Sequence, residues 1–284
     1  MKFHRAIVGD KILDTVGPTY YPIITIVTTL ILCRFVYLRK SLTFSGCVAT
    51  MFVGVSVFWN FGFGGYLILL VFFFTSTIFT KISKKQTQNI ASGIQKKGGC
   101  RDHFQVLANG GIAAFLAIFY RFTGNPIFIA LFGASIAEST ADTWAGEIGI
   151  MSPGLPISII TLKSVQKGLS GGISKLGTIA AFVGSFLISI IWCFFYYNLC
   201  SHWFKDTLFI SISGFIGCLV DSIFGDLFQV HYLVHGTNQI TEHEFTNGVQ
   251  NQYFKGVTWM NNDMVNFLSN LSSCACFLVL KFIF

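Results

Sequence analysis

Long apolar stretches separated by shorter polar ones dominate the hydrophobic pattern of the chain. Runs of this length can cross the hydrocarbon core of a bilayer as single helices. Glycines at 62, 64 and 65 separate the second run from the third, and acidic residues interrupt the fifth. The pattern predicts about eight transmembrane spans, at residues 20–38, 42–59, 64–80, 104–120, 126–147, 173–198, 208–229 and 264–284.

The composition agrees with a membrane protein. The chain of 284 residues is 53% hydrophobic and 11% charged, with a mean hydropathy of +0.65, whereas soluble domains carry about 25% charged residues. We therefore expect an all-α, polytopic membrane helix bundle, with an N-terminal tail at 1–19 and one membrane domain at 20–284. The tail shows no convincing signal peptide. In a eukaryote, the first span would direct the chain to the endoplasmic reticulum or another endomembrane.

The net charge of +7 does not indicate nucleic-acid binding, because the basic residues lie between the spans and form no stripe with exposed aromatics. With eight spans, the loops on one side hold twelve Lys and Arg residues, and the opposite loops hold only Arg121 and Lys205. The basic side is expected to be cytoplasmic, although the basic tail favours the opposite orientation. Three polar loops, at 81–103, 151–172 and 230–263, fall on that basic side.

The fifth predicted span carries acids that a membrane helix rarely tolerates. An ionisable group at the centre of a membrane helix costs about 2.5–3.5 kcal/mol on insertion scales, so it usually lines a cavity or pathway. Glu138 and Asp142 share a helix face, whereas Glu147 lies roughly 140° from Asp142 and joins them only if the helix ends near Gly146. Such carboxylates suit Mg²⁺ bound with substrate phosphates. Alternatively, Glu147 is solvated at a helix end and the other two acids pair with lysines.

The seventh predicted span places one acid on a face of small residues. Asp221 lies at helical spacing from Gly214, Gly217, Cys218 and Gly225. Small faces allow helices to pack closely, so we expect Asp221 to point into the bundle, near the acids of the fifth span. Asp226 lies roughly 140° from this face and is expected to meet water.

Two further groups of residues suggest substrate contacts. Residues 161–177 form a basic, Gly-rich turn that runs into a helix, and the backbone N–H groups of such turns bind anions. A structural turn with lysines at the lipid headgroups is the alternative. Asn109 beside two glycines, and Asn266 in a polar stripe of the last span, are either substrate contacts or packing positions between helices.

Several motifs, read in order, resemble one integral-membrane family. They are FFFTSTIFTK, GGCRDHFQVLANGG, ADTWAGEIGI, KGLSGGISKLGT, GCLVDSIFGDLFQ and VNFLSN. The pattern resembles the transmembrane protein 19 type, which includes plant phytyl-phosphate kinase, and it covers roughly residues 20–284. The most specific pieces are DTW-x-x-E-I-G and Gly-Gly-x-Ser-x-x-Gly-Thr. The family is more distantly similar to polyprenol kinases and CDP-lipid synthases, which use CTP and Mg²⁺.

The resemblance implies a kinase that phosphorylates an isoprenyl, phytyl-like monophosphate with Mg²⁺ and a nucleoside triphosphate, CTP being favoured over ATP. The expected partners are a membrane lipid and a nucleotide, and no nucleic acid. The expected metal ligands are Glu138, Asp142 and Asp221. The expected catalytic residues are Asp142, Glu147 and Lys167. The nucleotide phosphates are expected at Lys163, Lys167, Ser170, Gly171, Gly172 and Ser174, and the lipid at Asn109 and Asn266.

Two other functions fit the same features. Intramembrane acids, glycine-broken helices and polar stripes also describe an ion-coupled transporter, although the sequence shows no inverted repeat. A membrane protein without catalysis is the remaining alternative.

Overall fold

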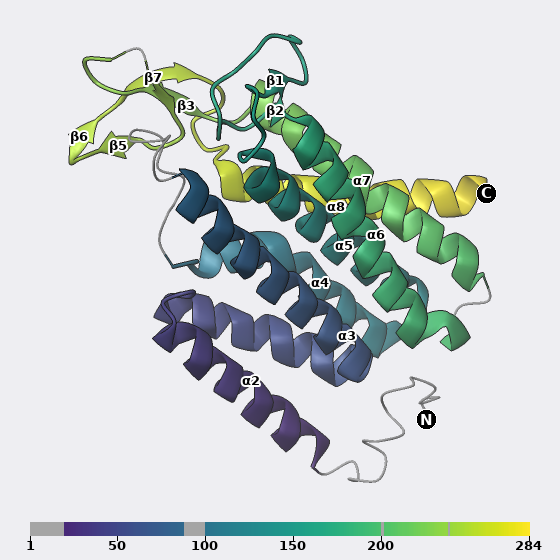
Figure 1. The fold of residues 1–284 in the computed structure, drawn as a ribbon. Coiled ribbons are helices and arrows are strands. Elements are labelled where there is room, and N and C mark those ends of the chain that lie inside the picture. Colours follow the sequence, from purple (N-terminus) through teal and green to yellow (C-terminus); the bar gives the residue numbers. More distant parts are fainter. Residues whose placement is uncertain (1–19, 88–99, 200–201, 238) are drawn as a thin grey trace.

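The computed structural model describes residues 20–87, 100–199, 202–237 and 239–284, so the predicted tail at 1–19 lies outside it. Long helices pack side by side, with short strands gathered at one end (Figure 1). A 3-10 turn, η1 (Tyr197–Leu199), follows the helix that ends at Tyr196. The helices are α2 (Tyr21–Leu38), α3 (Phe44–Thr87), α4 (His103–Thr123), α5 (Ile127–Gly149), α6 (Lys175–Tyr196), α7 (Trp203–Leu227) and α8 (Asn262–Ile283).

The element α3 is a hairpin of two antiparallel helical segments. Gly62 has φ 70° and ψ −162°, a conformation that is essentially restricted to glycine. The chain folds back after Gly62. This reversal brings the rings of Phe58 and Tyr66 together edge to face, with centroids 5.0 Å apart. A Cβ on Gly54 would likewise lie 3.4 Å from the Tyr66 ring. The two segments, 44–61 and 63–87, correspond to the predicted spans at 42–59 and 64–80.

The architecture is a helical membrane bundle, as predicted, but the number of eight spans is not confirmed. In the described part of the chain, five helices are long and apolar enough to cross a membrane, namely α3, α4, α6, α7 and α8. Helix α2 contributes a shorter apolar stretch, Ile23–Leu38. Helix α5 is absent from this group because its three carboxylates lower the hydropathy of its second half.

The all-α prediction holds for the bundle itself, and the structure adds short antiparallel strands in two loops at its polar end. Strands this short leave almost no period-2 signal in a sequence. They form because the backbone N–H and C=O groups of loops folded over the bundle need partners. In the first loop, β1 (Ile157–Ser158) pairs with β2 (Gly172–Ile173). In the second, β3 (His231–Leu233) lies between β4 (Ile240–Thr241) and β7 (Gln252–Lys255), and β5 (Phe245–Thr246) pairs with β6 (Val249–Gln250).

Helix α5 is the centre of the bundle. Every residue from Ile129 to Ala141 is buried, and α5 packs against α3, α4, α6, α7 and α8. The approach of α6 is close: a Cβ on Gly133 would lie 2.7 Å from the Trp192 ring, whose Nε1 donates to Ile129 O at 2.8 Å. A helix covered on all sides cannot present its acids to lipid. They must therefore face other helices or an internal cavity.

The described parts of the three polar loops gather at one end of the bundle, where α5 and α7 end and α6 and α8 begin (Figure 1). Residues of each loop line the same cavity, including Arg101, Ser170 and Glu242. The structure thus brings the three loops to one side, as the sequence predicted. That this side is cytoplasmic stays a prediction.

Candidate functional site

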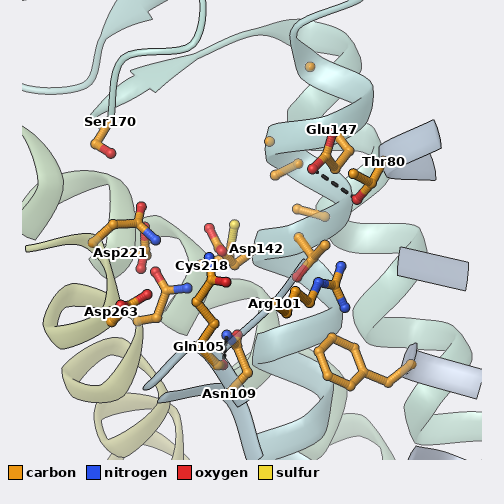
Figure 2. A pocket seen from close by; sticks show the side chains of 18 of the residues that line it. Thr80, Arg101, Gln105, Asn109, Asp142, Glu147, Ser170, Cys218, Asp221 and Asp263 are labelled. Carbon is orange, nitrogen blue, oxygen red and sulfur yellow. Dashed lines mark hydrogen bonds between the residues drawn. The ribbon is translucent and has the colours of Figure 1, made fainter. Parts of the chain in front are cut away.

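A cavity of about 400 Å³ lies at the polar end and extends between the helices. Its polar wall comes from α4, α5, α7, α8 and the Gly-rich loop before α6, and its apolar wall comes from α2 and α3. Asp142, Asp221 and Asp263 enter it from three different helices (Figure 2).

Asp142 and Asp221 form the acidic centre of the cavity. Their carboxyl groups lie within hydrogen-bonding reach of each other, although they belong to different helices. The small face of α7 allows this approach: a Cβ on Gly214 would lie 2.7 Å from the Cβ of Ala137. From α8, the amide nitrogen of Asn266 donates to Asp221 Oδ2 at 3.2 Å, in the amide orientation that satisfies both of its polar atoms. This is the juxtaposition that the small-residue face predicted.

Glu138 lies beneath the cavity rather than in its lining. Its side chain is 1% exposed and accepts hydrogen bonds from two residues of α8, Ser269 Oγ at 2.7 Å and Asn270 Nδ2 at 3.1 Å. Ser269 Oγ also lies 3.1 Å from Asp221 Oδ2, so one hydroxyl links the buried acid to the cavity acid. Gly217 leaves room for this arrangement, because a Cβ there would lie 2.6 Å from Glu138 Cγ. Glu138 thus supports the position of Asp221.

Glu147 does not join the two aspartates. Helix α5 continues to Gly149, so Glu147 projects from a different face. It accepts a hydrogen bond from Thr80 Oγ1 at 3.0 Å and another from Ser83 Oγ, both on α3. Figure 2 shows it at the α3 side of the cavity. The geometry therefore separates Glu147 from the acids with which it was expected to act.

The residues described here contain no group of three His, Cys, Asp or Glu side chains that could hold a metal ion. The expected site of Glu138, Asp142 and Asp221 is not preformed, because Glu138 is engaged by α8. The remaining pair still fits Mg²⁺ by its chemistry. That ion binds through one or two carboxylates and completes its shell with water and substrate phosphates. Two carboxylates this close repel each other unless a proton or a cation lies between them.

The Gly-rich loop brings part of its predicted set to the cavity. The N–H and hydroxyl of Ser170 both donate to Glu242 Oε1, at 2.8 and 2.7 Å, which ties the loop to the strand region after β4. Gly171 has φ +85°, and a Cβ on it would lie 2.5 Å from Asp226 Cβ. Only glycine therefore fits against the end of α7. Gly172 begins β2 and also lines the cavity.

Some of the basic and hydroxyl residues of this loop line the cavity, and others lie outside it. Ser174 caps α6, its Oγ accepting from Gly177 N at 3.2 Å, and lines the cavity. Lys167 also lines it, with Nζ donating to Ser152 O. Lys163 is exposed and is not part of the lining. Its contact with a nucleotide phosphate stays a prediction, because the turn that pairs its carbonyl with Ser158 N at 2.9 Å leaves the side chain outside the cavity in this structure.

Asp226 was expected to meet water, and the structure corrects this. Its carboxylate accepts a hydrogen bond from Ser158 Oγ and forms an ion pair with Lys255 Nζ at 3.0 Å. It thereby fastens the β1 loop and strand β7 to the end of α7. Asn109 lines the cavity, and its carbonyl accepts from Ser139 Oγ at 2.9 Å on α5. It thus helps to pack α4 against α5, and its contact with a substrate stays a prediction.

The cavity lining also contains charged residues that the sequence analysis did not assign to a site, among them Arg101, Asp263 and Glu242. Arg101 had counted only as a loop charge, although it precedes the capping box that starts α4. Asp263 lies in the first turn of α8, which Asn261 caps by accepting from Met264 N at 3.0 Å. For both Arg101 and Asp263, the sequence signal that could have indicated a site was a charged residue next to a helix N-cap. Glu242 lies in the loop whose strands the sequence did not reveal.

Similarity to known membrane proteins extends over most of the chain. Residues 27–274 match the family described as integral membrane protein DUF92. Protein PGR of Arabidopsis thaliana is 30% identical over 276 residues, which cover 90% of this chain and 94% of that protein. Protein VTE6, chloroplastic, of the same plant is 26% identical over 282 residues, covering 96% and 75%. The uncharacterized membrane protein MJ0933 of Methanocaldococcus jannaschii is 29% identical over 223 residues, covering 76% and 87%. No solved structure matches the chain.

Proposed function

The chain belongs to the integral membrane protein family DUF92, in agreement with its resemblance to the transmembrane protein 19 type, and on that premise we propose that it is a membrane-embedded lipid kinase. The proposed reaction transfers the γ-phosphoryl group of a nucleoside triphosphate to an isoprenyl, phytyl-like monophosphate. CTP is favoured over ATP because the more distantly similar lipid kinases and synthases use it.

One observation carries this proposal: the same cavity is acidic and polar at one end and apolar between the helices. A lipid kinase must hold a water-soluble nucleotide and an apolar chain at the same time. Asp142 and Asp221 stand at the polar end, next to the Gly-rich loop. Thr29 and Leu32 of α2, with Val53 and Leu69 of α3, line the apolar part.

Phosphoryl transfer requires mostly positioning and the neutralisation of charge. In the proposed step, an oxygen of the acceptor monophosphate attacks the γ-phosphorus. The bond from that phosphorus to the β–γ bridging oxygen breaks, and the nucleoside diphosphate leaves with the electron pair. The product is a lipid diphosphate. Because the attacking phosphate oxygen is already ionised, no side chain has to remove a proton.

The residues of the polar end divide this work between them. Asp142 and Asp221 would hold Mg²⁺, which supplies positive charge to the phosphates when it is bound. The Ser170–Ser174 turn and the N-terminus of α6 would face the nucleotide phosphates with backbone N–H groups. The Ser170 N–H, which donates to Glu242 Oε1 in this structure, would exchange that acceptor for a phosphate oxygen. Lys167, fixed by Ser152 O, adds positive charge beside them.

The test is a transfer assay with purified protein in lipid nanodiscs. It supplies γ-labelled CTP or ATP, Mg²⁺, and prenyl monophosphates of several chain lengths, with the matching prenyl alcohols as controls. We expect the label to appear in prenyl diphosphates and to appear faster with CTP. Label that remains on the nucleotide with every acceptor would overturn the proposal.

A further inference from the structure

Arg101 is held at the cavity by its backbone, independently of its side chain. It lies just before α4 and forms a parallel bridge with Leu42. Its N–H donates to Ser41 O at 3.0 Å, and its carbonyl accepts from Thr43 N at 3.0 Å. A Cβ on Gly46 would collide with that carbonyl, so the main chain packs tightly against the start of α3. The side chain of Arg101 can therefore change without loss of these contacts.

The guanidinium of Arg101 lacks a polar partner in the described part of the chain. It lies over the Phe73 ring, 5.9 Å from the centroid, and lines the cavity. None of the described residues hydrogen-bonds to it or pairs with it within ion-pair distance. Burial lowers the pKa of Arg101, and the nearby Glu147 carboxylate partly opposes this shift. A guanidinium has five N–H donors, and such donors are costly to bury without acceptors.

Besides Arg101, the cavity is lined by residues of α2 and of the α3 hairpin, and we call this part of it the apolar arm. Its walls are Thr29 and Leu32 of α2 and Val53, Gly54, Tyr66 and Leu69 of the α3 hairpin. Gly54 follows Gly46, the neighbour of Arg101, by about two helical turns, or roughly 12 Å along the axis. The hydroxyls at the far end satisfy each other, since Tyr66 OH donates to Thr29 Oγ1 at 3.2 Å. An apolar lipid chain could therefore occupy the arm without leaving these hydroxyl groups without hydrogen-bond partners.

We propose that Arg101 binds the phosphate monoester of the acceptor lipid while the lipid chain occupies the apolar arm. This inference rests on the proposed function and names the residue that selects its acceptor. The ligand class is an amphiphile with one long apolar chain and a terminal phosphate monoester. The planar guanidinium can hold two phosphate oxygens at once, and it stands where the apolar arm meets the polar chamber.

The position of Arg101 favours the acceptor phosphate over the nucleotide phosphates. Figure 2 shows its guanidinium on the side of Thr80 and Glu147, with Ser170 and Asp221 across the cavity. The loop expected to bind nucleotide lies with Ser170. A phosphate on Arg101 would therefore face a nucleotide held on the opposite wall, as transfer between the two requires.

The test measures binding in the absence of nucleotide. Purified protein in nanodiscs is titrated with radiolabelled geranylgeranyl monophosphate and, separately, with geranylgeraniol. Arg101→Gln should weaken binding of the monophosphate at least about tenfold, and Arg101→Lys should weaken it less because a point charge remains. Both variants should bind the alcohol like the wild type. The matched control is Arg39→Gln, since Arg39 also lies over a phenylalanine ring, that of Phe35, but is exposed.

The outcomes separate this inference from the proposed function. Wild-type affinity of Arg101→Gln for the monophosphate, or equal affinity of the wild type for monophosphate and alcohol, overturns the inference. In the transfer assay, Arg101→Gln should raise the KM for the lipid. A raised KM for the nucleotide alone also overturns the inference, while the kinase function stands. Arg101-dependent binding without any transfer supports the inference and overturns the kinase function.

Discussion

At the scale of single residues, the site depends on how a buried carboxylate is accommodated. Glu138 is enclosed by α8 hydrogen-bond donors, and the absence of a side chain at Gly217 leaves the space for it. A buried polar group without partners costs several kcal/mol in a membrane. The hydrogen bonds to Glu138 therefore fix α5 against α8 just below Asp142, and Ser269 extends the link to Asp221 of α7.

Gly217→Ala is expected to lower stability by about 1–3 kcal/mol, because overpacking displaces its neighbours. The added Cβ would lie 2.6 Å from Glu138 Cγ and 2.9 Å from Ser273 Cβ. The matched control is Gly111→Ala on α4, where the nearest atom is 3.7 Å away and alanine favours the helix. Thermal unfolding in detergent should show a lower Tm for the first variant and an equal or higher Tm for the second. Equal Tm values for both would contradict the packing described.

Asp226→Asn is expected to weaken the attachment of the loops rather than the chemistry. Asp226 holds Ser158 and Lys255 and does not line the cavity. Loss of its charge should cost about 1 kcal/mol of stability while transfer activity stays within a few fold of the wild type. Activity and Tm are measured on the same preparation. Loss of activity at unchanged Tm would assign Asp226 to the reaction instead.

The sequence predicts site residues well where a regular helix face determines them. Asp221 was correctly predicted to lie near Asp142, because the small-residue face of α7 that carries it must pack against other helices. Glu147 and Lys163 could not be placed in this way, because the position of Glu147 depends on where α5 ends and that of Lys163 depends on the shape of a turn. Arg101 and Asp263 stand beside helix starts. Their approach to the cavity follows from tertiary contacts that periodicity does not encode.

At the scale of elements, the α3 hairpin builds the apolar arm, and Gly62 makes the reversal possible. Gly62→Ala should destabilise the protein by about 1–3 kcal/mol, since its backbone conformation is strained for any residue with a Cβ. Gly154→Ala is the control, because a Cβ there meets nothing within 4 Å. The comparison uses Tm and the yield of folded protein. A Gly62→Ala protein as stable as the control would show that α3 does not require this turn.

Most helix ends were predictable to within about two residues, because an apolar run of that length rarely forms any other structure. The second segment of α3 extends seven residues past the predicted span, to Thr87, and α7 begins five residues early, at Trp203. The glycine cluster also marked the reversal within α3. The strands between α7 and α8 were not predictable, since their residues alternate weakly and their pairing joins segments separated by turns. They form over the open end of the bundle, where Glu242 reaches Ser170.

At the scale of the whole molecule, the account requires the three polar loops to share one side of the membrane. Single cysteines at the exposed positions Lys85, Gly154 and Thr237, in a cysteine-depleted background, should all react with an impermeant thiol reagent from the same side. A cysteine at Asn125, between α4 and α5, should react from the other. From the distribution of basic residues, the shared side should be cytoplasmic. Labelling that alternates among the three loops would contradict the arrangement around the cavity.

The central claim is that the Asp142–Asp221 pair supports phosphoryl transfer to a lipid monophosphate. The most direct measurement is the rate of label transfer from γ-labelled CTP to a prenyl monophosphate by the wild type, Asp142→Asn and Asp221→Asn. Each amide keeps the shape of the side chain and loses its charge. We predict a rate reduced by at least about 100-fold in both variants, with Tm and lipid binding retained. Transfer at the wild-type rate by folded Asp142→Asn protein would contradict the account.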